Sequence, residues 1–92
     1  MAYTINSSGS VKSYERVATQ LKTISGDVNT AAKSLASSNN DKSIDIVESK
    51  LYEVAKELES ISSEITSFAR SITTATNQVN DEIKKAEEAR KV

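Results

Sequence analysis

The chain has no cysteine, histidine, tryptophan or proline, and only two glycines among its 92 residues. Without cysteine it can form neither a disulfide nor a thiolate metal site. Without histidine it lacks the usual base for a serine or threonine nucleophile. We therefore predict that the protein is not an enzyme and that it holds no metal and no cofactor. The absence of proline removes the strongest interruption of long helices.

An excess of charge of one sign is also missing, because 12 basic residues stand against 13 acidic ones and the formal net charge is −1. A nucleic-acid-binding surface would require a basic excess, so we expect no nucleic-acid partner. No stretch approaches the roughly 20 apolar residues of a membrane span, so we expect no membrane insertion. Residues 1–10 have neither the positive charge nor the apolar core of a secretory signal, and any export is expected to follow a signal-independent route.

Apolar residues recur at alternating steps of three and four in two stretches, which is the a/d pattern of a heptad repeat. We predict one helix over residues 10–37, with Ser10 as its N-cap, and a second over residues 43–90. The first stretch contains Tyr14, Val17, Leu21, Ile24, Val28, Ala31 and Leu35. The second contains Ile44, Val47, Leu51, Val54, Leu58, Ile61, Ile65, Phe68, Ile72, Ala75 and Val79.

The stretches are separated by small polar residues, Ser37 to Asp41, which favour a turn over a helix interior. We place the turn at residues 38–42, and so short a connection makes its two helices antiparallel neighbours. The predicted fold is one all-α domain, an antiparallel two-helix coiled-coil hairpin with a polar lead over residues 1–9 and a longer second helix. Its register sets Leu35 opposite the region of Val47, and Val11 opposite residues 68–72.

The same pattern predicts that the a and d residues of each helix face the other helix, with Tyr14 and Phe68 in the core. Charge supports an antiparallel pairing. The first helix has four basic and two acidic residues, whereas residues 41–64 have three basic and seven acidic ones. Opposite charges across the two helices help to set their direction, although each exposed pair contributes only about 0–1 kcal/mol.

The second helix is longer than the first, so its apolar stripe beyond about Ile72 has no predicted intramolecular cover. We expect another protein to cover it, either a second copy, giving a four-helix bundle, or a different helical protein. The hypothetical partner interface consists of Tyr52, Phe68, Ile72, Val79 and Ile83.

Two further features leave alternatives open. Gly26 is either a tolerated surface glycine or a place where a partner backbone approaches closely. Residues 60–76 are rich in serine and threonine, which are mediocre helix formers. This stretch is either an ordinary solvated surface or a face of low charge that packs against a partner helix.

Two heptad helices around a short polar turn, with a longer C-terminal arm, resemble the small helical-hairpin proteins of type VII secretion, the WxG-like superfamily. The Trp-x-Gly of that group has no counterpart at Ser37 to Asp41, and its Tyr-x-x-x-Asp/Glu motif is missing because Tyr52 is followed four residues later by Lys56. The resemblance is therefore to a divergent branch, the small partners of toxins that carry helical LxG-type domains.

The resemblance implies a protein-binding hairpin of the bacterial cytoplasm, one secreted without a signal peptide, or both. It would act as the partner or targeting factor of a secreted toxin, or as a small secreted substrate. Two alternatives come from other classes. One is a self-assembling structural subunit, similar in outline to type III needle proteins, and the other is a generic coiled-coil adaptor.

Overall fold

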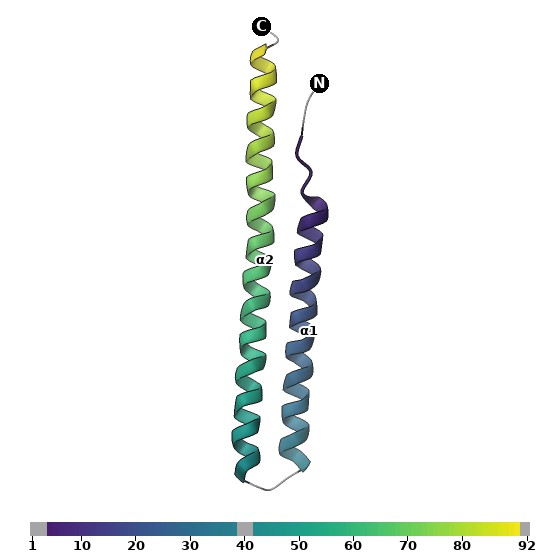
Figure 1. Ribbon diagram of the computed structural model, residues 1–92, viewed down its shortest axis with the longest axis vertical. Coiled ribbons are helices and arrows are strands. Elements are labelled where there is room, and N and C mark those ends of the chain that lie inside the picture. Colours follow the sequence, from purple (N-terminus) through teal and green to yellow (C-terminus); the bar gives the residue numbers. More distant parts are fainter. Residues whose placement is uncertain (1–3, 39–41, 91–92) are drawn as a thin grey trace.

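The computed structural model describes residues 4–38 and 42–90 (Figure 1). Helix α1 spans Ser8–Ser38 and helix α2 spans Lys42–Arg90. They run antiparallel, side by side, and the C-terminal end of α2 continues past the beginning of α1 (Figure 1). The predicted all-α hairpin with a longer second helix is confirmed, whereas most of the predicted turn lies outside the described residues. With 49 residues, α2 is about 73 Å long.

Helix α1 begins two residues before the predicted cap. The Asn6 Oδ1 atom accepts hydrogen bonds from the Ser8 amide at 3.0 Å and from the Ser8 hydroxyl at 2.7 Å. The Val11 amide donates to the Ser7 carbonyl oxygen at 2.9 Å, which closes the first helical turn. A short amide side chain that bonds the backbone just ahead of it is a common way to start a helix. Asn6 therefore organises the start of α1, and Ser10 lies inside the first turn.

Three contacts fix the register of the two helices. The Ser25 hydroxyl donates to the Ala55 carbonyl oxygen at 2.7 Å, and the Ser62 hydroxyl donates to the Ala18 carbonyl oxygen at 2.6 Å. Nearer the N-terminus, the rings of Tyr14 and Phe68 meet edge to face with their centroids 5.2 Å apart. These contacts confirm the predicted register.

The interface between the helices is made of small residues, and here the a/d prediction is wrong in part. The buried side chains recur every seven residues and lie one position after the predicted d residues; they are Ala18, Ser25, Ala32, Ala55, Ser62 and Ala69. The a residues Leu21 and Leu58 are half-buried, but the d residues are exposed. Tyr14 and Phe68, expected in the core, are 40% and 53% exposed.

Close approach of the two backbones explains why each helix turns its small residues, and not its d residues, toward the other helix. A serine side chain is short, so its hydroxyl reaches a carbonyl of the opposite helix only where the helices nearly touch. Alanine and serine permit such an approach, and the gain in contact offsets the exposure of larger residues. Each helix is consequently turned so that its d side chains point out of the interface.

The two helices repeat one short sequence. The pattern Val-Ala-x-x-Leu-x-x-Ile-Ser occurs at residues 17–25 and again at residues 54–62. With this offset of 37 residues, Ser25 corresponds to Ser62 and Ala18 corresponds to Ala55. The hydrogen bond from Ser25 to Ala55 is therefore equivalent to the one from Ser62 to Ala18. The hairpin therefore has an approximate two-fold axis, which lies perpendicular to the plane of the two helices.

Direct ion pairs do not hold the helices together. Within residues 4–38 and 42–90 the single ion pair joins Lys50 and Glu53 at 3.5 Å, and both residues belong to α2. The predicted complementarity of charge thus produces no interhelical ion pair among the described side chains. The direction of the helices follows from their short connection and from the packing of small residues.

Gly26 lies exposed on α1, and nothing in the hairpin requires a glycine there, because a Cβ atom at this position would meet no atom within 4 Å. We expect Gly26→Ala to raise the free energy of unfolding by about 1 kcal/mol, since alanine loses less backbone entropy in a helix. Thermal unfolding followed by circular dichroism measures this. A lower midpoint would contradict the prediction. A higher midpoint with loss of partner binding would instead assign Gly26 to a partner contact.

Candidate protein-interaction face

Within residues 4–38 and 42–90, neither a metal-binding cluster nor an unpaired buried polar side chain is present. In the described ranges no group of three or more acidic residues is placed to hold a metal ion. Every buried side-chain nitrogen or oxygen of these residues has a hydrogen-bond partner, so none points unpaired into a cavity. Neither described helix is long and apolar enough to cross a membrane.

One side of the hairpin is instead lined by large apolar side chains, which we call the apolar face. Each of its members is between 40% and 53% exposed; they are Tyr14, Val17 and Ile24 on α1, and Val47, Val54, Ile61 and Phe68 on α2. Apart from Tyr14 they occupy d positions, and equivalent positions on two antiparallel helices flank the same side of their interface. The contact between Tyr14 and Phe68 joins the two rows. The two rows therefore lie on the same side of the hairpin.

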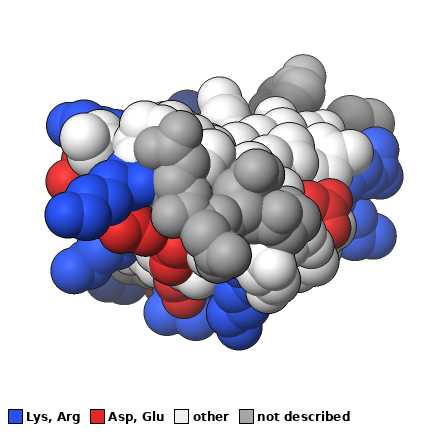
Figure 2. All heavy atoms as spheres, turned by 90° about the horizontal axis from the view of Figure 1, so that it is seen from below, with Lys and Arg blue, Asp and Glu red and all other residues white. Residues whose placement is uncertain are grey.

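The opposite side is polar. A shallow groove between the helices there is lined by Thr19, Lys22, Glu59, Ser63, Thr66, Ser67 and Arg70. Viewed along the bundle, the uppermost side is predominantly uncharged, and basic and acidic residues gather along the other sides (Figure 2). The hairpin thus has two unlike faces.

The serine- and threonine-rich stretch satisfies many of its own hydroxyl groups. Thr66, Ser71 and Thr73 each donate to the carbonyl four residues earlier in α2, at 3.0 to 3.3 Å. Ser62 donates across to α1. Part of the stretch therefore builds the interface between the two helices and part returns its hydrogen bonds to its own helix.

The segment before α1 lies against the C-terminal arm of α2. The Ile5 amide donates to Asn80 Oδ1 at 2.7 Å, and Asn80 Nδ2 donates to the Ile5 carbonyl oxygen at 2.9 Å. Thr4 also borders the surface around Ile83 and Lys84. The sequence-based expectation that the arm has no intramolecular cover is therefore wrong for one of its flanks, because the polar lead lies along it.

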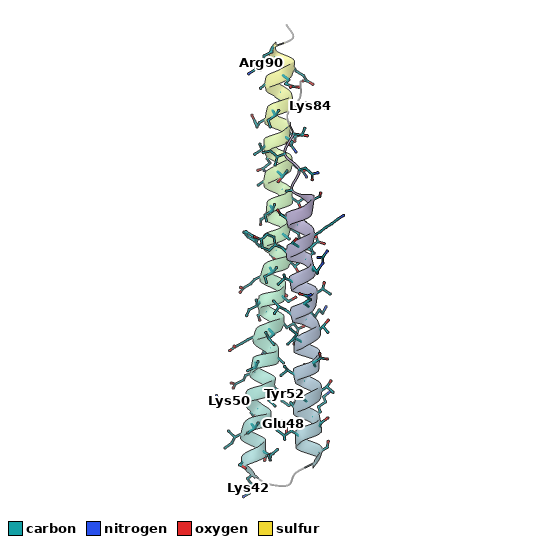
Figure 3. All side chains as sticks on the ribbon, turned by 45° about the vertical axis from the view of Figure 1, so that its right-hand side comes forward. Lys42, Glu48, Lys50, Tyr52, Lys84 and Arg90 are labelled. Atoms are coloured by element: carbon teal, nitrogen blue, oxygen red, sulfur yellow. The ribbon has the colours of Figure 1, made fainter. Side chains whose placement is uncertain are left out.

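The five predicted interface residues do not form one surface. Phe68 belongs to the apolar face, and Val79 is 42% exposed further along the arm. Ile72 and Ile83 are half-buried. Tyr52 is half-buried in the turn-proximal part of α2 (Figure 3).

Six members of the apolar face were missed because the heptad pattern assigned them to the interior: Tyr14, Val17, Ile24, Val47, Val54 and Ile61. For Val17, Ile24, Val54 and Ile61, the signal that would have found them is the alanine or serine that directly follows each one.

Comparison with models of protein families finds no match to this chain. Curated protein sequences and solved structures also contain no significant match. The function is therefore argued from the exposed surface and from the architecture.

Proposed function

We propose that the protein is a protein-binding helical hairpin that receives a helical partner along its apolar face. The observation that carries this proposal is the alignment of seven large apolar side chains, each at least 40% exposed, on one side of a polar molecule. Single exposed apolar residues are ordinary, but several of them aligned on one side of a molecule indicate a binding surface. Apart from Tyr14, each row repeats every seven residues, that is every two helical turns, so its members lie on one side of their helix and can contact the apolar stripe of another helix.

In more detail, we propose that the hairpin acts in a type VII secretion pathway. There it would bind the helical LxG-type domain of a secreted toxin and help to present it for export, or be exported itself as a small substrate. The short polar stretch between the helices, the long second helix and the open apolar face support this role. A polymerising subunit similar to type III needle proteins, or a coiled-coil adaptor, is the alternative.

Co-purification with the product of the neighbouring open reading frame tests the proposal. We expect a stable complex of defined size, and we expect Phe68→Asp to weaken it at least about tenfold, because a carboxylate would be buried against apolar surface. Ser63→Asp places the same charge on the polar side and should have little effect. Growth of the purified chain into long polymers would favour the structural subunit. Equal loss of binding in both variants would contradict the assignment to the apolar face.

A further inference from the structure

The two rows of the apolar face repeat each other. Val17 and Ile24 on α1 correspond to Val54 and Ile61 on α2 at the same offset of 37 residues that relates the two serine hydrogen bonds. The approximate two-fold axis is perpendicular to the plane of the helices and therefore to this face. Consequently the face presents nearly the same surface after it is turned end for end.

We infer that a second copy of this chain, turned end for end, covers the apolar face and forms a two-fold dimer of hairpins with four helices. The inference rests on the proposed function, because it names the helical protein that closes the face when no other partner is bound. A heterologous partner would then have to replace the second copy or bind to the dimer. The C-terminal arms of the two copies would project from opposite ends.

The hairpin needs such a cover because its own core is thin. Among the described residues no large side chain is fully buried, and the buried positions hold only alanine and serine. Burial of apolar area is the main source of stability, and helices gain most of theirs from tertiary packing. The exposed valine, isoleucine and phenylalanine side chains of the apolar face supply apolar area for this purpose.

Side-chain size favours the end-for-end orientation. Under the approximate two-fold axis Phe68 corresponds to Ala31, so a bulky residue on α2 is matched by a small one on α1. A second copy turned end for end brings its own Ala31 to the level of Phe68. The methyl group there leaves room for the ring, as the alternation of large and small residues in packed layers requires.

Charge favours the same orientation. Lys50, Glu57 and Glu64 are spaced by seven residues along α2, all exposed, at the heptad position that borders the apolar face. If the dimer axis passes near Glu57, the two copies of Glu57 repel each other, but Lys50 of each copy lies beside Glu64 of the other, so two attractive pairs stand against one repulsive pair. If the two hairpins pointed in the same direction, α2 of each copy would lie beside α1 of the other, and both Lys50–Glu64 pairs would be lost. Such exposed pairs contribute little affinity, but they select one orientation over another.

Sedimentation equilibrium of the purified full chain tests the dimer. We expect twice the mass of one chain, which is 10.0 kDa, and a thermal midpoint that rises with concentration. Ile24→Lys with Ile61→Lys should weaken self-association at least about a hundredfold. Gly26→Lys with Ser63→Lys adds the same charge at exposed positions away from the apolar face, again 37 residues apart, and should leave the dimer intact.

A single cysteine tests the orientation, since the chain has none of its own. Glu57→Cys should form a disulfide-linked dimer on mild oxidation, because the two copies of this residue lie near the axis, within the short reach of a disulfide. Ser63→Cys, on the polar side, should not. Crosslinking of Ser63→Cys alone would overturn the proposed face, and a dimer that crosslinks at neither position would overturn the orientation.

A wild-type chain that is monomeric at all concentrations would also overturn the inference. If that monomer still binds the product of the neighbouring reading frame through Phe68, the proposed function stands and only the second copy is excluded. If neither a second copy nor that product binds, both proposals fail.

Discussion

Ala55→Leu is expected to destabilise the hairpin strongly, with a much lower midpoint of thermal unfolding. Ala55 is 1% exposed and lies where Ser25 of α1 reaches its carbonyl oxygen at 2.7 Å. A leucine cannot fit between backbones that are this close, so the helices must separate and the hydrogen bond must break. Overpacking of a close interface costs about 1–3 kcal/mol and occasionally more. We expect a loss of about 3 kcal/mol, which is a large share of the stability of a small domain.

Val54→Leu is the matched control, because it introduces the same residue one position earlier. Val54 is 45% exposed on the apolar face, so we expect its substitution to change the free energy of unfolding by less than about 0.5 kcal/mol. Thermal unfolding by circular dichroism at one fixed concentration compares the two. If the a and d residues filled the interface instead, Val54 would be the sensitive position and Ala55 would tolerate leucine. Ala18→Leu should match Ala55→Leu, since the two positions are related by the approximate two-fold axis.

The sequence predicts the helices and their direction well, but not their rotation about their own axes. Alternating steps of three and four specify which residues lie on one side of each helix, and the polar turn makes the helices antiparallel. In five of the heptads, however, a large d residue is followed directly by a small alanine or serine, as at Ile24 and Ser25. Two helices can bury only one of these rows. Hydrophobic area favours the larger row, whereas close backbone contact and the hydroxyl bonds favour the smaller one.

This ambiguity also explains why the candidate site was only partly predicted. Phe68 and Val79 were assigned to an interface, but Val17, Ile24, Val54 and Ile61 were assigned to the core by the same heptad rule. The pairing of Asn80 with Ile5 could not be predicted from periodicity, because it depends on one side-chain amide meeting an extended backbone. According to our proposal, the small residues form the interface within one hairpin. The d residues of the heptad pattern become covered only when the hairpin binds a partner.

The C-terminal arm gives the second large expected effect. Val79→Asp with Ile83→Asp should weaken association with a helical partner that extends from the apolar face onto the arm, while the hairpin stays folded. Val79 is 42% exposed. Ile83 is half-buried beside Thr4, in the part of α2 that continues past the beginning of α1. Helix-binding grooves recognise apolar anchors at such four-residue steps, and two carboxylates buried there would cost several kcal/mol. Because the three register contacts lie nearer the turn, the unfolding midpoint should change little.

Thr74→Asp with Gln78→Asp is the control for the arm, since both residues are exposed and the spacing and added charge are the same. Binding to the product of the neighbouring reading frame, measured by calorimetry, and unfolding, measured by circular dichroism, should separate the two variants. Unfolding of the whole chain by Val79→Asp with Ile83→Asp would show that the arm and the polar lead belong to the core of the hairpin. Normal folding with normal binding would exclude the arm and leave the apolar face around Phe68 as the site of the partner.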